Sequence, residues 1–180
     1  MERYESEKFI LVKREPNGIA YVTINRPKSL NSLTKSMMTD MAQAFKSLDR
    51  DDSVRVIILS GSGRAFCSGV DLTSAEDVFK GDVKDLESDP VAQMERARKP
   101  IIGAIGGFAV TAGFEIALAC DIVVAAKGAK FIDTHARLVL LAQPQLFPLL
   151  LFFVENLWFE SVYVCNLISI EEYILILFRR

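Results

Sequence analysis

The sequence is poor in the residues that build metal sites and disulfide frameworks. Its 180 residues contain one histidine, His135, and three widely spaced cysteines, Cys67, Cys120 and Cys165, with no Cys-x-x-Cys pair. This odd set is typical of reduced intracellular thiols, and we expect no metal site. A nucleophilic Cys67 would need a base, and the single histidine lies far along the chain, so we do not favour that role.

The chain also lacks a basic stripe and an apolar leader. Its net charge is −2 and its pI is near 5.5, which argues against a nucleic-acid surface. The first eight residues are charged and contain three acids, which argues against a secretory signal and against a mitochondrial presequence. We expect an intracellular protein, in the peroxisome or cytosol rather than the mitochondrion.

Apolar runs and helical periodicities alternate along the first 130 residues. This alternation predicts one α/β domain with a largely parallel sheet. The expected strands are 9–13, 19–25, 54–60, 101–105 and 122–126, and the expected helices are 34–48, 91–98 and a segment around Glu115. Pro16-Asn17-Gly18 predicts a hairpin between the first two strands, and polar residues 74–90 predict a solvated loop or short helices.

Residues 106–121 carry the strongest chemical signal. Small residues run from Gly106 to Gly113, and a lone glutamate, Glu115, follows among apolar residues of a helical segment. We expect that carboxylate to be buried, which costs several kcal/mol unless it is paired or used. Two interpretations stay open at this point: a loop with a buried, hydrogen-bonded glutamate, or an oxyanion site with an acid/base beside it.

A second loop follows the apolar run 54–60, which is typical of a buried parallel strand. Open α/β sheets place ligands at this carboxyl end of a strand. The loop, residues 61–72, ends in Gly69-Val70-Asp71 and therefore matches neither the P-loop pattern nor the dinucleotide fingerprint. No nucleotide motif is present.

Four sequence segments together carry a family resemblance. They are Ile24-Asn25-Arg26-Pro27-Lys28-Ser29-Leu30-Asn31-Ser32-Leu33, Ala65-Phe66-Cys67-Ser68-Gly69-Val70-Asp71-Leu72, and the runs 99–105 and 113–121. In this order and spacing the chain resembles the enoyl-CoA hydratase/isomerase (crotonase) family over residues 8–137. The resemblance implies an α/β, crotonase-like fold of repeated ββα units, incomplete at the C-terminus, with an acyl-CoA-binding core at residues 1–137.

The resemblance also implies a reaction centre. The backbone N–H groups of Val70 and Ala112 would polarise an acyl-CoA thioester carbonyl, and Glu115 would act as acid/base. His135 stands where the family has a second carboxylate; it is either a replacement acid/base or a structural residue, and Asp133 and Asp121 are other available carboxylates. Hydration usually needs two such groups, whereas double-bond migration or thioester hydrolysis needs fewer. β-Oxidation-type hydratase or isomerase chemistry is the expected ancestry.

The implied substrate contacts lie in the same two loops and at the start of the Glu115 helix. Loops 26–33 and 68–72 would hold the CoA adenine and pantetheine, with Arg26 or Lys28 near the phosphates. The full set is Arg26, Lys28, Ser29, Ser68, Asp71, Leu72 and Gly113. Coenzyme A is part of the substrate, and no separate cofactor is implied. Full-length relatives are expected to form homotrimers or hexamers.

Residues 138–180 differ in composition from the rest of the chain. They contain no glycine, and no charge occurs from Leu138 to Val154. A membrane helix is disfavoured because Gln143, Pro144, Gln145 and Pro148 interrupt the run. A packed core segment would show periodicity, so we favour a divergent, non-family tail, as from alternative splicing, a retained intron or a frameshift. The alternative function is then a catalytically defective isoform that binds or interacts.

Overall fold

The fold begins with the predicted hairpin. The structure, a computed structural model, describes residues 8–74, 85–133, 167–169 and 175–178. Strand β1 (Ile10–Arg14) pairs antiparallel with β2 (Ile19–Ile24), and Gly18 in the connecting turn has a φ of 86°. Both strands and the turn are confirmed to within one residue of the predicted bounds, because Asn-Gly turns and alternating apolar residues specify a hairpin locally.

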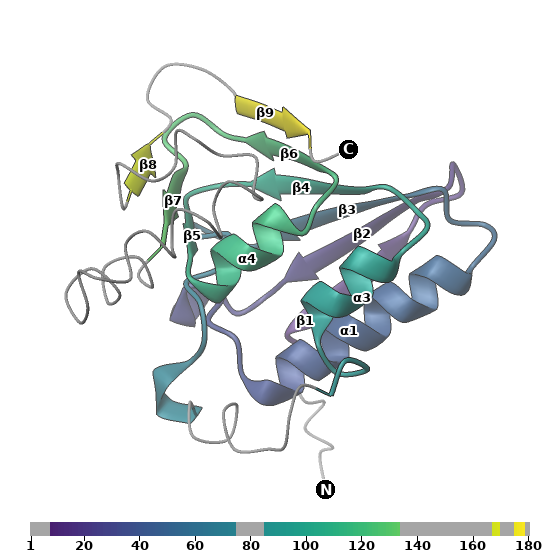
Figure 1. Cartoon of the computed structure of the whole chain (residues 1–180), viewed down its shortest axis with the longest axis horizontal. Helices are drawn as coiled ribbons and strands as arrows, with labels where there is room; N and C mark the ends of the chain where they lie inside the picture. Colours follow the sequence, from purple (N-terminus) through teal and green to yellow (C-terminus); the bar gives the residue numbers. More distant parts are fainter. Residues whose placement is uncertain (1–7, 75–84, 134–166, 170–174, 179–180) are drawn as a thin grey trace, which may run out of the picture.

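The main layer is a six-stranded sheet in the order β1-β2-β3-β4-β6-β9 (Figure 1). Strands β2, β3 (Val56–Gly61), β4 (Ile101–Ile105) and β6 (Ile122–Ala125) run parallel. The antiparallel strands β1 and β9 (Leu175–Phe178) form the two edges. The α/β class and the largely parallel sheet are therefore confirmed.

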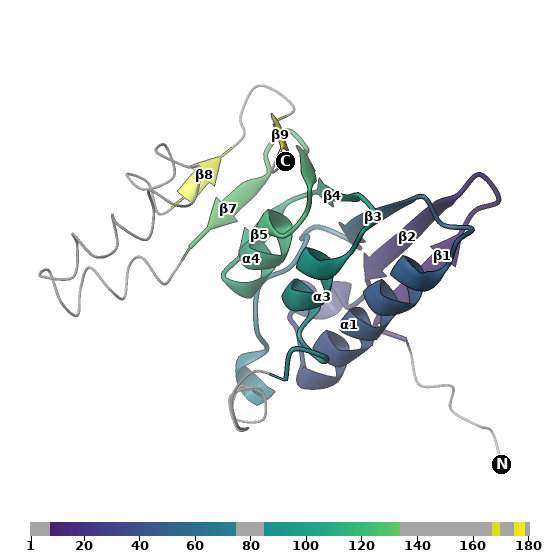
Figure 2. The ribbon, with the colours of Figure 1, turned by 45° about the vertical axis from the view of Figure 1, so that its right-hand side comes forward.

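Helices α1 (Lys35–Arg50), α3 (Pro90–Arg96) and α4 (Ala112–Leu118) lie on one face of this sheet (Figures 1 and 2). Helix α1 starts where predicted, because the Thr34 hydroxyl accepts a hydrogen bond from the Met37 N–H and caps it. Its buried stripe is Met37, Met41, Phe45 and Leu48, all with no exposed surface. Each such side chain contributes roughly 1.5–3 kcal/mol by its burial.

A smaller sheet of β5 (Phe108–Val110), β7 (Lys130–Ile132) and β8 (Leu167–Ser169) lies beside α4. We predicted none of these strands. Each has three residues, too few to establish an alternation, and β5 lies inside the small-residue stretch that we interpreted as a loop. The order β4-β5-α4 completes one ββα repeat and leads from β5 directly into the helix that carries Glu115.

Two short pieces of residues 138–180 pair with the core. Strand β9 pairs with β6, with Val123 opposite Leu177, and β8 pairs with β7, with Phe131 opposite Ile168. The rest of that segment lies outside the described residues, as do His135 and most of the predicted loop 74–90. In the part of the chain that the structure covers, no helix is long and apolar enough to cross a membrane.

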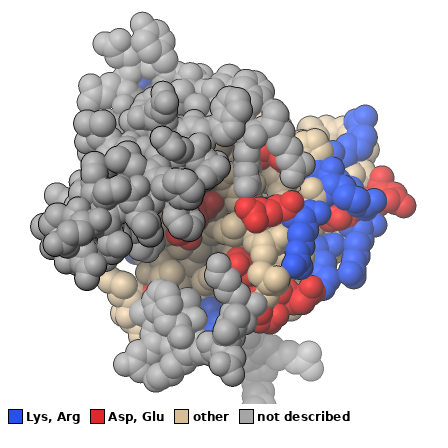
Figure 3. Space-filling view, in the orientation of Figure 1, with Lys and Arg blue, Asp and Glu red and all other residues tan. Residues whose placement is uncertain are grey.

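Charges of both signs interleave on the viewed face, on the side away from the small sheet (Figure 3). Ion pairs form at the end of α1: Arg14 Nε lies 3.0 Å from Asp51 Oδ2, and Arg98 Nε lies 3.3 Å from Asp49 Oδ2. The Asp49 Oδ1 also accepts the Arg98 N–H at 2.8 Å. These pairs tie the end of α1 to the end of β1 and to the chain that enters β4.

Candidate active site

The loop that follows β3 is held on one side by the connection between β2 and α1. Leu33 forms a short parallel bridge with Val70: the Leu33 N–H donates to the Gly69 carbonyl at 2.8 Å, and the Asp71 N–H donates to the Leu33 carbonyl at 2.9 Å. The Ser68 N–H donates to the Leu30 carbonyl at 3.1 Å. The two loops predicted from the sequence to share a site therefore lie side by side.

On its other side the same loop pairs with β5. The Cys67 N–H donates to the Phe108 carbonyl at 3.0 Å, and the Val110 N–H donates to the Cys67 carbonyl at 3.0 Å. Because β5 leads into α4 through Thr111, this pairing fixes the position of the first residue of α4 relative to the loop. The Thr111 N–H is itself held by the Ile132 carbonyl of β7, at 2.9 Å.

Two glycines bring the loop and the start of α4 into direct contact. Gly69 has a φ of +98°, and a Cβ built on it would overlap the Thr111 hydroxyl and lie 3.1 Å from the Val110 carbonyl oxygen. A Cβ on Gly113 would overlap the Cys67 carbonyl oxygen and lie 2.8 Å from the Cys67 Cβ. Only glycine fits at either position. Val70 follows Gly69 and Ala112 precedes Gly113 in the sequence, so this contact brings Val70 and Ala112 close together.

The predicted oxyanion donors carry available N–H groups. Ala112 is the first residue of α4, so its N–H has no partner within the helix. Neither Ala112 nor Val70 donates its N–H to any residue that the structure describes. Both residues are half-buried. Two free donors on adjoining segments can hydrogen-bond an oxygen atom that carries developing negative charge.

Glu115 is exposed, and our expectation of a buried carboxylate was wrong. Helix α4 buries Gly113, Phe114, Ile116 and Ala117, whereas Glu115 points away from that side. A seven-residue helix on a sheet is covered on one side only, so apolar sequence neighbours do not imply burial. The Glu115 side chain pairs with no residue in the described ranges, and it lies one helical turn from Ala112.

The other carboxylates differ in their surroundings. The Asp121 Oδ2 accepts the Ile101 N–H at 2.9 Å, and the Asp121 N–H donates to the Ile101 carbonyl at the same distance, so Asp121 secures the start of β4. Asp133 is half-buried directly after β7. His135 lies outside the described residues, and its role as a second acid/base stays a prediction.

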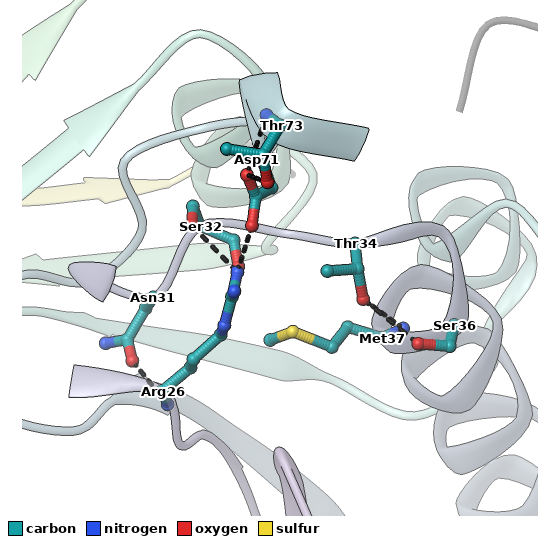
Figure 4. A network of polar contacts seen from close by, with 8 residues as sticks. All are labelled: Arg26, Asn31, Ser32, Thr34, Ser36, Met37, Asp71 and Thr73. Carbon is teal, nitrogen blue, oxygen red and sulfur yellow. Dashed lines mark hydrogen bonds and ion pairs between the residues drawn. The ribbon is translucent and has the colours of Figure 1, made fainter. Parts of the chain in front are cut away.

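Asp71 and Arg26, which the resemblance assigns to substrate binding, pair with each other (Figure 4). Arg26 Nη1 donates to Asp71 Oδ2 at 2.5 Å. Thr73 donates to Asp71 Oδ1 through its N–H at 3.0 Å and its hydroxyl at 2.7 Å. The hydrogen bonds from Thr73 and then from Arg26 lower the pKa of Asp71 from its ordinary 3.8 to about 2.

Asn31 is a site residue whose role the sequence analysis did not identify. It is fully buried and has a φ of 57°. Its Nδ2 donates to the carbonyls of Ser62 at 2.8 Å and Ala65 at 2.7 Å, and its Oδ1 accepts the Arg26 N–H at 2.8 Å. The side chain thus joins the β2–α1 connection to the β3 loop. Asparagine tolerates a left-handed backbone conformation better than most residues do. The asparagine at position 31 was therefore a signal in the sequence for this conformation.

The remaining predicted contacts lie around the rim. Lys28 is exposed and Ser29 half-buried in the short helix η1 (Pro27–Ser29), and Ser68 is half-buried. Leu72 begins η2 (Leu72–Ser74) with 87% of its surface exposed. Lys28 forms no salt bridge with the described part of the chain, in contrast to Arg26.

Cys67 is buried, and this burial raises the pKa of its thiol to about 11. The thiolate that a nucleophile requires is therefore disfavoured. Across the described residues, no three His, Cys, Asp or Glu side chains gather in a metal-binding group.

Comparisons with known proteins identify the family to which the chain belongs. The sequence model of the enoyl-CoA hydratase/isomerase family matches residues 14–150. A protein of Arabidopsis thaliana named "Probable enoyl-CoA hydratase 1, peroxisomal" is 72% identical over 137 residues, which are 76% of this chain and 52% of that protein. The 1,2-epoxyphenylacetyl-CoA isomerase of Escherichia coli K12 is 37% identical over 141 residues, 74% of this chain and 53% of that protein.

Solved structures agree. An enoyl-CoA hydratase/isomerase from Mycobacterium paratuberculosis has a TM-score of 0.66 and 29% identity, over 74% of this chain and 55% of that one. An enoyl-CoA hydratase from Mycobacterium avium subsp. paratuberculosis has a TM-score of 0.61 and 32% identity, over 71% and 48%. The predicted resemblance and the crotonase-like fold are confirmed. The chain spans about half the length of the relatives it matches.

Proposed function

Because this chain belongs to the enoyl-CoA hydratase/isomerase family, we propose that it binds acyl-CoA thioesters and polarises their carbonyl with the N–H groups of Val70 and Ala112. One observation carries the proposal: two donors without described partners sit on segments held in contact by Gly69 and Gly113. A fixed oxyanion donor of this kind contributes about a hundredfold or more in rate.

Hydration is the reaction that we propose first. Water oxygen bonds to C3 of the enoyl thioester, the C2=C3 electron pair shifts to form an enolate, and C2 then takes up a proton. The two N–H groups stabilise the enolate oxygen, and Glu115 moves a proton to or from the reacting water or C2. Isomerisation passes through a different intermediate, a dienolate: a proton leaves C2 of a 3-enoyl thioester, the C3=C4 electron pair takes up a proton at C4, and the double bond forms between C2 and C3. His135 is proposed as the second acid/base that hydration requires.

Lys28 is the residue that we propose for the CoA phosphates. Both basic candidates follow β2, but Arg26 is paired with Asp71 whereas Lys28 is exposed and forms no described ion pair. Lys28→Ala should weaken CoA-ester binding most strongly at low salt. Lys13→Ala is the matched control, because Lys13 is 75% exposed and lies near the opposite end of β2. Equal effects of the two substitutions would contradict the assignment.

Turnover of short- and medium-chain enoyl-CoAs by the purified chain tests the proposal. We expect conversion to the 3-hydroxyacyl or isomerised thioester. A folded sample that shows no CoA-ester binding in calorimetry would refute it. The Arabidopsis relative is named peroxisomal, and we propose the same compartment here; imaging of a fluorescent fusion in cells tests this.

A second candidate function rests on the composition of residues 138–154, which carry no charge. We propose, as the alternative, that the protein binds ligands or partners without turnover. Size separates the two candidates: an active protein should run as a discrete trimer or hexamer, and a defective one as an aggregate. In the second case, limited proteolysis should release a fragment that ends near Arg137.

A further inference from the structure

We infer that Asp71, held by Arg26, is a positioning residue that aims the Val70 N–H, and that neither side chain binds substrate. This inference rests on the function proposed above. It assigns to the two residues a role different from the CoA contact that the resemblance implied, and it explains why an aspartate follows an oxyanion donor directly.

Hydrogen bonds fix the peptide planes on either side of Val70. The Gly69 carbonyl and the Val70 N–H belong to one trans peptide unit, so they point in opposite directions. The Leu33 N–H holds that carbonyl at 2.8 Å, and the Val70 N–H is therefore aimed away from the β2–α1 connection. The next peptide unit is held too, because the Asp71 N–H donates to the Leu33 carbonyl.

The side chain of Asp71 secures this pairing. Asp71 is 8% exposed, and its two oxygens accept from Arg26 and Thr73 (Figure 4). Arg26 lies in the β2–α1 connection, directly before η1, so the ion pair fastens the loop on which Val70 lies to that connection. A loop held at three points loses less freedom when a ligand binds, which favours a pre-formed donor.

Arg26 has further hydrogen-bond partners within the protein. Its Nη1 also reaches the Ser32 carbonyl at 3.2 Å and the Ser32 hydroxyl at 3.1 Å, and its backbone N–H donates to Asn31. The side chains of Arg26 and Asp71 are 23% and 10% exposed. A phosphate would have to displace an existing, partly buried pair to reach this guanidinium, whereas Lys28 is open to solvent.

The ion pair also balances the charge beside the proposed oxyanion site. The Asp71 carboxylate stays ionised beside the residue whose N–H would face a developing enolate. A bare negative charge there would oppose that enolate, because like charges repel strongly where water is partly excluded. Arg26 compensates it. Loss of Arg26 alone should therefore harm the site more than loss of both charges.

Absorption spectroscopy of bound cinnamoyl-CoA tests the inference. Its thioester carbonyl is conjugated with a ring, so polarisation of the carbonyl shifts the absorption band to the red, while titration gives Kd. We expect Asp71→Asn to reduce the red shift of the fully bound ligand, with Kd changed by no more than about threefold, because the lost interaction acts on the polarised state. Asp49→Asn removes another Arg-paired aspartate, far from the site, and should change neither quantity.

The Arg26 variants complete the design. Arg26→Met should reduce the red shift more than the double variant Arg26→Met with Asp71→Asn, and Arg26→Lys should recover part of it. Far-UV circular dichroism checks each variant for folding, and Arg26→Lys serves if Asp71→Asn does not fold. A raised Kd with an unchanged red shift would make the pair a substrate contact and overturn the inference. A red shift that Asp71→Asn leaves intact would overturn it as well. Absence of wild-type binding would refute the proposed function itself.

Discussion

Gly113 of helix α4 lies against the carbonyl oxygen of Cys67, in the loop that follows β3, so closely that no side chain fits between them. This contact joins two segments that are 46 residues apart in the sequence and places Ala112 beside the loop of Val70. The geometry of the proposed oxyanion site therefore depends on the absence of one Cβ atom.

Gly113→Ala should separate the two donors. The new Cβ would overlap backbone of Cys67, which cannot rotate away, so α4 or the loop must shift. We expect loss of the red shift of bound cinnamoyl-CoA and a lower melting temperature. Gly106→Ala is the matched control, since a Cβ there meets nothing within 4 Å. A Gly113→Ala protein with the wild-type red shift would show that the contact does not set the site.

Glu115→Gln should lower enoyl-CoA turnover by roughly a hundredfold or more, because the amide keeps the size of the side chain but cannot exchange a proton. KM and the melting temperature should change little, since Glu115 is exposed and pairs with no described residue. Steady-state kinetics measure this. Asp40→Asn, an exposed acid on α1, is the control. An unchanged kcat for Glu115→Gln would mean that His135 or Asp133, and not Glu115, transfers the proton.

Asp71 should link stability to acid pH. Its folded-state pKa of about 2 lies below the ordinary value of 3.8, so its contribution to stability is present above about pH 4 and is lost as the pH falls towards 2. The difference in unfolding free energy between wild type and Asp71→Asn should therefore shrink between about pH 5 and pH 2. Urea titrations at several pH values measure it. A pH-independent difference would mean that the carboxylate is not specifically stabilised.

The sequence predicted the elements that local rules determine. Helix α1 has a stripe of buried apolar residues and a capping threonine, and it was placed to within two residues. Strand β5 was not predicted because three residues are too few to show an alternation of apolar and polar residues. Its pairing partners, the β3 loop and β7, are also distant in the sequence. The Arg26–Asp71 pair joins residues that are 45 positions apart, so no rule of sequence spacing predicts it. The exposure of Glu115 could not be predicted either, because it depends on which side of α4 packs against the sheet.

Strand β9 should protect the edge of the large sheet. It pairs with β6 from Ile122 to Ala125, and an uncovered strand edge offers backbone groups to other chains. A chain that ends at Tyr173 should therefore self-associate more than the full chain, as measured by sedimentation velocity. A chain that lacks only Arg179 and Arg180 is the control. Equal self-association of the two shortened chains would show that β9 does not protect this edge.

The amide NMR spectrum of the isotope-labelled chain, titrated with crotonyl-CoA, tests the central claim most directly. If the Val70 and Ala112 N–H groups bind the thioester carbonyl, their amide proton resonances should move downfield by more than those of Gly69 and Gly113 next to them. Binding that shifts other resonances and leaves those of Val70 and Ala112 in place would contradict the account.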